Sequence, residues 1–433
     1  MLTAEHRFRI VVAQIGARRH YAIPVLLERA GLLEAFFTDL HADIWQLRML
    51  ERTIPRKLQP ASMKRLLGRR VENVPLDKIE CFPWFGVRRI LQERKATSPG
   101  ALLRKYLRAN SRFCELVLGR GLGNADTLYV FNGAGLELMQ TARRRGLRVI
   151  LEQTAAPLAW DELLLAEERD RWPGWEGSGA SESDWWPLAD REEQEWRLAD
   201  SIVCGSEYVR DAVARRNGPT ERCEVVPYGT DLKRFLPSSP HGNQTPLRVL
   251  FVGTIQLRKG LPYLMEAARR LPRTQVVVRA VGPIAVSRQA ATRIGQALDL
   301  VGPVPRANIA EQFAWANVLV LPTLSEGSAG VCYEALATGL PVITTPNAGS
   351  VVRDGVEGCI IQIRDAEALA DRILRFVNDR DLLREMSTNA LRRAKEFSWE
   401  RYAERLVAAI SRLTLDDTEI RPALESSSSP RVL

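Results

Sequence analysis

The sequence contains few residues that bind metals or form disulfides. Its 433 residues include only four histidines and six cysteines, and no two cysteines have Cys-x-x-Cys spacing. Zinc sites and disulfide-rich scaffolds need more of these residues at closer spacing. We therefore expect no metal site and no disulfide framework. Isolated cysteines in apolar surroundings are typical of buried free thiols in a reducing compartment.

Long hydrophobic runs are lacking too. No stretch reaches the ~18 consecutive apolar residues of a membrane-spanning helix. The apolar run near the start ends in Gly-Ala-Arg-Arg-His without a small-residue cleavage site, which indicates a first strand rather than a signal peptide. Apolar residues make up 45% of the chain and charged residues 26%, as in ordinary globular proteins. We expect a cytoplasmic protein with two or three domains.

Negative charge is scarce in one segment. Residues 43–112 contain 17 Lys or Arg and six Asp or Glu, an excess larger than the net charge of +9 for the whole chain. Within it, residues 45–71 mix apolar side chains with eight basic ones. Such segments bind anionic membrane surfaces at about 1 kcal/mol per basic residue. We predict peripheral contact with the inner face of a membrane through 45–71; the alternative is an amphipathic helix with a solvated basic face. No pattern typical of nucleic-acid binding is present, so we expect no nucleic-acid partner.

Short apolar runs bounded by Gly and Pro alternate with helix-like stretches along the chain. This pattern predicts α/β domains with doubly wound parallel sheets, in which ligands bind at the carboxyl ends of the strands. A proline-bounded stretch separates two such domains. The predicted units are an N-terminal domain (1–236) with a basic segment (43–113) and a loop-rich insertion (157–186), a C-terminal domain (247–396), a helix (397–413) and a disordered tail (414–433). The tryptophans of 157–186 would line an acceptor surface or cap a small core of their own.

The most informative stretch is Val318–Thr345. It predicts a strand, a loop of small residues, a helix and a second strand. Small residues let a ligand approach the backbone, and the free amides at the helix start form an anion site. Glu326 and Glu334 lie eight positions apart in this stretch, or about 12 Å along a helix. That is too far to share one metal or one proton, but it suits two contacts along an elongated ligand.

A second phosphate site is indicated in the C-terminal domain. An apolar strand ends at Gly253, and the loop from Thr254 leads through Gly260 into a helix. Arg258 and Lys259 therefore place two cations at the carboxyl end of a strand, beside a helix start. This arrangement is typical of a diphosphate site.

The frame around Glu326 and Glu334 resembles the Glu-x7-Glu signature of glycosyltransferase family 4. These are retaining GT-B enzymes with two Rossmann-like domains facing a central cleft. The resemblance implies transfer of a sugar from a nucleotide diphosphate sugar to an acceptor hydroxyl, without a metal or other cofactor. Envelope polysaccharide, glycolipid or related glycan synthesis is the expected setting, and the basic segment makes a lipid-linked acceptor plausible.

The resemblance also assigns roles to residues of the C-terminal domain. Glu326 would bind hydroxyls of the donor sugar, and Glu334 those of the ribose. Arg258 and Lys259 would stabilise the leaving diphosphate. Family members often carry Arg where this chain has Thr254, and Arg258 is the candidate substitute. The remaining donor-binding positions are Gly253, Thr254, Gly302, Val304, Ser328, Ala329 and Gly330.

The resemblance is weaker in the N-terminal domain. Gly16, Ala17 and His20 follow the first strand, in the loop that faces the donor phosphates and the acceptor in the family. Glu152 stands where members often place His or Asp. His20 would be either an active-site hydrogen-bonding group or a structural residue.

Two other functions fit parts of the sequence. The first is another GT-B enzyme, such as a nucleotide-sugar epimerase, which would need no acceptor, or a sugar phosphorylase, for which no further phosphate or pyridoxal phosphate site is indicated. The second is a non-catalytic basic module bound to a membrane or nucleic acid. It would leave the frame around Glu326 and Glu334 unexplained.

Overall fold

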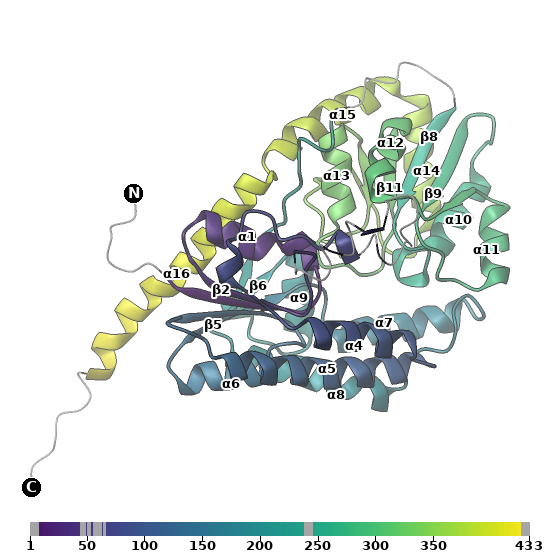
Figure 1. The fold of residues 1–433 in the computed structure, drawn as a ribbon. Coiled ribbons are helices and arrows are strands. Elements are labelled where there is room, and N and C mark those ends of the chain that lie inside the picture. Colours follow the sequence, from purple (N-terminus) through teal and green to yellow (C-terminus); the bar gives the residue numbers. More distant parts are fainter. Residues whose placement is uncertain are drawn as a thin grey trace, which may run out of the picture.

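The computed structural model describes residues 8–43, 49, 53, 54, 63, 66–237 and 246–425. Two parallel sheets form the centres of two domains, with helices packed around each sheet, and one long helix crosses from the second domain back to the first (Figure 1). The predicted fold class, two doubly wound α/β domains, is confirmed.

The N-terminal sheet has seven parallel strands in the order β3-β2-β1-β4-β5-β6-β7. Because the order reverses between β1 and β4, their loops open the crevice where ligands bind in such sheets. Both faces of the sheet are covered, which explains the continuous apolar runs. The strands are β1 (Ile10–Gln14), β2 (Leu33–Thr38), β3 (Ile79–Cys81), β4 (Thr127–Phe131), β5 (Arg148–Gln153), β6 (Ser201–Cys204) and β7 (Cys223–Val225).

The C-terminal sheet has six parallel strands in the order β10-β9-β8-β11-β12-β13. Its order reverses between β8 and β11, so the loops after these two strands lie side by side. They are the loops that contain Lys259 and Glu326. The strands are β8 (Leu247–Val252), β9 (Val276–Val281), β10 (Asp299–Gly302), β11 (Val318–Leu321), β12 (Val342–Thr344) and β13 (Gly358–Ile360).

Helix starts follow local capping rules. The side chains of Ser98, Ser206 and Asp365 accept hydrogen bonds from backbone amides at the starts of α5, α9 and α14. The helices of the N-terminal domain are α1 (Ala22–Arg29), α4 (Pro83–Arg94), α5 (Pro99–Arg120), α6 (Leu136–Arg144), α7 (Leu158–Arg171), α8 (Glu182–Leu198) and α9 (Glu207–Arg215). Those that follow are α10 (Leu261–Arg270), α11 (Arg288–Gly295), α12 (Ile309–Trp315), α13 (Gly330–Thr338), α14 (Ala366–Asn378), α15 (Arg380–Lys395) and α16 (Trp399–Glu425).

Helix α16 returns to the N-terminal domain, where Tyr402, Leu406 and Ile410 are buried in its core (Figure 1). The helix continues to Glu425, past position 414, where the sequence analysis expected order to end. No glycine or proline interrupts residues 399–421, so nothing in that stretch stops the helix. Residues 426–433 of the predicted tail lie outside the described residues.

The expectation of a loop-rich insertion at 157–186 is wrong for most of that segment. Helix α7 fills its first half and α8 begins at Glu182. The glycines and serines that suggested a loop are concentrated in 174–181, whereas 158–171 is rich in Leu, Ala, Glu and Arg, which favour helix.

The tryptophans of this insertion have two different surroundings. Trp175 is buried in the core of the C-terminal domain, and Trp172 donates a hydrogen bond from Nε1 to Tyr263 at 3.3 Å. Trp185 instead belongs to a small cluster with Ala159 and Ala189. The end of α7 and the turn after it therefore join the two domains.

The domains also meet backbone to backbone at Gly327. A Cβ atom on this glycine would lie 1.8 Å from the carbonyl oxygen of Thr154. The Ser206 hydroxyl, at the start of α9, donates to the carbonyl oxygen of Gly327. Only glycine fits this contact, because every other side chain would push the domains apart.

We predict that Gly327→Ala lowers the free energy of unfolding by about 1–3 kcal/mol, since the added methyl group overpacks a backbone contact. Gly119→Ala is the matched control, because Gly119 lies in α5 with nothing within 4 Å of its would-be Cβ. Its stability should stay the same or rise by up to about 1 kcal/mol. Urea denaturation of both variants measures the difference. Equal unfolding midpoints would contradict the tight contact.

Candidate active site

An ion pair joins the two central residues of the candidate site. Lys259 ends η5 (Leu257–Lys259) in the loop after β8, and its ammonium group pairs with Glu326 in the loop after β11. Both side chains are about 15% exposed, so each compensates the buried charge of the other. The loops are also tied by the amide of Leu324, which donates to the carbonyl oxygen of Arg258 at 2.8 Å. The structure thus brings together two residues that are 67 positions apart.

The first turn of α13 lies next to Glu326. No side chain caps this helix, so several amides at its start are available to an anion. The amide of Ala329 donates to the carbonyl oxygen of Ala348 at 3.0 Å, and the Ser328 hydroxyl lies 2.7 Å from that of Tyr333. These contacts fix Ser328, Ala329 and Gly330 against the cleft.

Glu334 occupies the next turn of α13. Burial raises its pKa to about 7, although Arg306 and Arg234 oppose this shift. The carboxyl group has no ion-pair partner among the described residues, so its oxygens are available to ligand hydroxyls. Arg306 and Arg234 lie together, since the Arg234 guanidinium donates to the carbonyl oxygen of Arg306 at 2.6 Å.

His20 comes from the opposite domain and meets the same arginine. Its Nδ1 lies 2.8 Å from Nη1 of Arg306. Burial, Arg306 and Arg234 together lower the pKa of His20 to about 4, so the imidazole is neutral at pH 7 and accepts this hydrogen bond. Neither Arg306 nor Arg234 was predicted as a site residue.

Arg258 is held by a carboxylate of the opposite domain. Its Nη1 lies 3.7 Å from Asp161 of α7. Burial raises the pKa of Asp161 to about 6, while Ser325 and Arg258 oppose this shift. Neither Asp161 nor this pairing was predicted. In this arrangement Arg258 neutralises Asp161, and Thr254, the position next to Gly253, carries no charge.

The predicted donor-binding positions Gly253, Gly302 and Val304 lie on neighbouring loops. Gly302 ends β10 with a φ of +80°, and its carbonyl oxygen accepts from the amide of Gly282 at 2.9 Å. The carbonyl oxygen of Gly253 packs against Gly282, where a Cβ would lie at 1.9 Å. Val304 is half-buried against the core of the C-terminal domain. Gly253, Gly302 and Val304 are therefore at one edge of the sheet.

The loop after β1 is held from both sides. Gly16, with a φ of +74°, donates its amide to Asp39 at 2.8 Å, and Ala17 is half-buried beside it. Arg19, His20 and Tyr21 all have positive φ values, an unusual run for residues with side chains. Contacts of the Arg19 guanidinium in the domain interior stabilise this unusual backbone.

Arg19 lies in an aromatic cage in the domain interior. Its Cζ is 3.0 Å from the ring centre of Tyr228 and 4.7 Å from that of Tyr402 on α16. Glu152 completes the cage: it is fully buried, lies 3.7 Å from Arg19, and accepts a hydrogen bond from Tyr129 at 2.8 Å. Glu152 therefore holds the loop in place from the interior.

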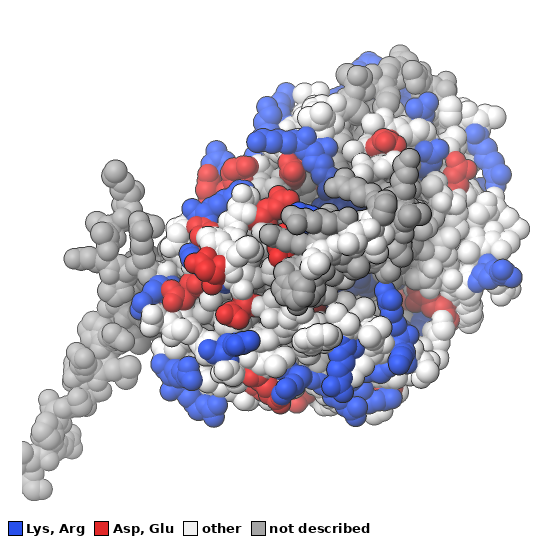
Figure 2. Space-filling model, in the orientation of Figure 1, with Lys and Arg blue, Asp and Glu red and all other residues white. Residues whose placement is uncertain are grey.

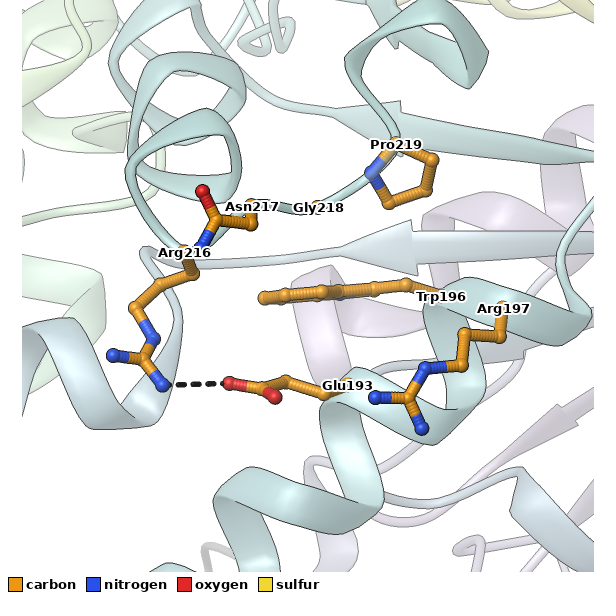
Figure 3. A pocket seen from close by; sticks show the side chains of 7 residues that line it. All are labelled: Glu193, Trp196, Arg197, Arg216, Asn217, Gly218 and Pro219. Carbon is orange, nitrogen blue, oxygen red and sulfur yellow. Dashed lines mark hydrogen bonds and ion pairs between the residues drawn. The ribbon is translucent and has the colours of Figure 1, made fainter.

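A separate cavity of about 320 Å³ lies away from the cleft. It is found at the carboxyl-terminal ends of α8 and α9, and thus at the amino edge of the sheet. Figure 3 shows the Trp196 ring between Pro219 and the ion pair of Glu193 with Arg216. The lining residues are Glu193, Trp196, Arg197, Arg216, Asn217, Gly218 and Pro219.

In the described part of the chain, no group of three or more His, Cys, Asp or Glu side chains is placed to hold a metal ion. No helix among these residues has both the length and the apolar character needed to cross a membrane.

Comparison with known proteins gives one family match and several relatives. Residues 246–379 match the family of glycosyl transferases group 1. The D-inositol 3-phosphate glycosyltransferases of Geodermatophilus obscurus and Nocardia farcinica are 34% and 31% identical to the chain over 244 and 237 residues. These matches cover 50% and 49% of this chain and 54% and 52% of the relatives. The chain thus spans about half the length of the curated relatives it matches.

Solved structures share the fold over nearly the whole chain. Sucrose-phosphate synthase from Thermosynechococcus elongatus has a TM-score of 0.63 at 20% identity and covers 95% of this chain and 100% of its own. HepE of Anabaena in complex with UDP has a TM-score of 0.59 at 16% identity, covering 93% and 100%. The chain therefore has the GT-B fold, and its residues 246–379 match the glycosyl transferases group 1 family.

Proposed function

We propose that the protein transfers a glycosyl group from a nucleotide diphosphate sugar to an acceptor hydroxyl, with retention of anomeric configuration and without a metal. The observation that carries the proposal is the ion pair of Lys259 with Glu326 beside the uncapped start of α13, within the matched residues 246–379. This pair places a cation that can bind a diphosphate next to a carboxylate that can bind sugar hydroxyls, and both side chains are partly buried.

The chemistry follows from these charges. The bond between the sugar C1 and the diphosphate oxygen breaks, and a bond from C1 to the acceptor oxygen forms. Lys259 and the amides of Ser328 and Gly330 stabilise the negative charge that develops on the diphosphate, because they are held in place before the reaction. The acceptor attacks from the face that the diphosphate leaves, and a diphosphate oxygen takes the acceptor proton. Glu334 accepts the ribose hydroxyls.

Donor binding changes the pairing of Lys259. The diphosphate competes with Glu326 for the ammonium group, and this frees the Glu326 carboxylate to accept hydrogen bonds from the sugar. Glu326 thus acts mainly on the sugar, whereas Lys259 acts on the diphosphate.

The class of acceptor is proposed from the relatives of the chain. The relatives named above are D-inositol 3-phosphate glycosyltransferases, which makes a phosphate-bearing polyol the first soluble acceptor to test. The sequence favoured a lipid-linked acceptor in envelope polysaccharide or glycolipid synthesis. The basic stretch 45–71, on which that expectation rested, lies mostly outside the described residues, so its membrane contact stays a prediction.

Helix α4, further along the chain, provides independent support for a membrane surface. Trp84 is 86% exposed, Leu91 51% and Val87 41%. Their spacing of three and four residues places them on one helix face. The opposite face is packed, since Gly86 is buried and Arg89 pairs with Asp39 at 2.9 Å.

Basic residues border this apolar face. Arg88, Arg94 and Lys95 are exposed, and none has an ion-pair partner within the described ranges. Figure 2 shows Lys and Arg, with fewer Asp and Glu among them, along the lower edge of the molecule, where Figure 1 places α4, α5 and α8. An apolar face with a cationic border fits an anionic lipid surface. Helix α4 begins at the carboxyl edge of the sheet, the edge that also faces the cleft, so we place the entry of a lipid-linked acceptor on this side.

We predict that Glu326→Ala lowers transfer about 100- to 1,000-fold, since hydrogen bonds to the reacting sugar are lost. Binding of the nucleoside diphosphate should be kept or strengthened, because Lys259 loses its internal competitor. Glu404→Gln is the control: Glu404 is 61% exposed in a surface ion pair with Arg401, which contributes little.

Transfer rates with a labelled donor and calorimetric binding of the diphosphate measure both effects. Near-normal turnover in Glu326→Ala would remove Glu326 from the mechanism. Consumption of the nucleotide sugar by wild-type protein without any acceptor would instead favour an epimerase.

We predict that vesicles of phosphatidylglycerol and phosphatidylcholine bind the full chain, and that Trp84→Ser with Leu91→Ser weakens this binding at least 10-fold. The reason is that the two most exposed of the three apolar residues on this face become polar. Val301→Ser is the control, because Val301 is 46% exposed on the C-terminal domain. Co-sedimentation is the measurement. Equal binding of the α4 variant and the wild type would contradict the assigned surface, and vesicle binding without any sugar transfer would support the non-catalytic module.

A further inference from the structure

We propose that Arg18 and Thr154 form a phosphate-binding subsite on the N-terminal side of the cleft. Neither residue was predicted as a site residue, although both follow strands whose ends were expected to face the cleft. It rests on the proposed function only for the identity of the phosphate, which belongs either to the donor or to the acceptor.

The Arg18 guanidinium has little internal compensation. Its Nη1 donates to the Thr154 hydroxyl at 3.1 Å, and its Cζ lies 5.5 Å from the ring centre of Phe131. No carboxylate of the described residues lies within ion-pair distance. A guanidinium has five N–H donors, and this is its one hydrogen bond within the described part of the chain. Burial lowers the pKa of Arg18, and distant carboxylates such as Glu152 offset this only partly. An anionic ligand would provide the negative charge that the residues around the Arg18 guanidinium do not supply.

Three other basic residues of the cleft have carboxylate partners, whereas Arg306 and Arg234 contact His20 and a backbone carbonyl oxygen instead. Lys259 pairs with Glu326 and Arg258 with Asp161. In the same loop as Arg18, Arg19 pairs with Glu152. Arg18 therefore differs from these three paired residues, and its guanidinium is available to an anion from outside.

Hydrogen bonds fix the backbone around Arg18. The Gln14 side chain donates to the carbonyl oxygens of Gly16 at 2.8 Å and Arg18 at 3.1 Å. The next residue, Arg19, is fixed in its aromatic cage, and the Tyr21 hydroxyl donates to the carbonyl oxygen of Leu40 at 2.8 Å. Arg18 is thus oriented before any ligand binds, which lowers the entropy cost of binding.

Thr154 places the subsite beside the donor loop. Its carbonyl oxygen packs against Gly327, the residue after Glu326. The Thr154 hydroxyl also donates to Asn132 at 2.8 Å, which fixes its orientation. A phosphate bound by Arg18 would therefore lie next to the reacting sugar. Two sources fit this place: the donor diphosphate, for which Thr254 supplies no cation, and a phosphate on the acceptor. The planar guanidinium suits either.

The test compares Arg18→Gln, Arg18→Lys and wild-type full chain by calorimetry. The probes are inorganic phosphate, the nucleoside diphosphate that stabilises the wild type most, and the corresponding monophosphate. Arg9→Gln is the control, because Arg9 is exposed at the amino end of β1. Arg18→Gln should weaken phosphate binding about 10- to 100-fold, as expected for a lost hydrogen bond to a charged group. Arg18→Lys should lie between, since it keeps the charge but loses the planar fork.

The outcomes identify the source. If Arg18 binds the donor diphosphate, Arg18→Gln weakens binding of the nucleoside diphosphate and leaves binding of the monophosphate unchanged. If the acceptor phosphate is bound, the diphosphate is unaffected, and inorganic phosphate added to nucleotide-saturated protein binds wild type better than the variant. Equal phosphate affinity in wild type and a folded Arg18→Gln, or no phosphate binding by wild type, would overturn the proposal. Failure of all nucleotides to bind would instead refute the proposed function, while the phosphate arm still tests Arg18.

Discussion

The contact between Gly327 and the backbone at Thr154 fixes how the two domains meet. Because a Cβ would lie 1.8 Å from the Thr154 oxygen, the loop with Glu326 can sit against the end of β5 only with glycine at this place. Helix α16 and the tryptophans after α7 hold the same arrangement from two other sides. The carboxyl ends of both sheets are thereby brought face to face, which is the condition for a site shared by two domains.

Several charged residues form ion pairs in the cleft, and a bound ligand would replace one partner of such a pair. Lys259 with Glu326 lies on the C-terminal side, and Arg258 with Asp161 spans the domains. Partly buried pairs of this kind cost desolvation energy, and a bound diphosphate would replace one internal partner with an external one. The raised pKa values of Asp161 and Glu334 have the same origin, since burial disfavours their charged forms.

The sequence predicted features that depend on residues close together in the chain. It missed contacts between residues that lie far apart in the chain. Apolar runs between glycines located the strands, and the strand-loop-helix pattern placed Lys259 and Glu326 at carboxyl ends, because both signals lie within a few residues. The partners Asp161 and Arg306 come from other elements, with no periodicity that connects them to the loops they contact. Helix α7 was not predicted because the glycines after it suggested that the whole segment was a loop. Glu152 was expected in the cleft, but a buried cage around Arg19 cannot be recognised without the fold.

The most direct test of the account is whether the cleft binds a nucleoside diphosphate without a divalent cation. Thermal unfolding in the presence of UDP, GDP, ADP, dTDP or CDP, with and without magnesium, answers this. A ligand at about 100 times its dissociation constant stabilises the folded state by roughly 2.7 kcal/mol. The account predicts that one diphosphate raises the unfolding temperature equally with and without magnesium. No shift with any of the five, or a shift that requires magnesium, would contradict it.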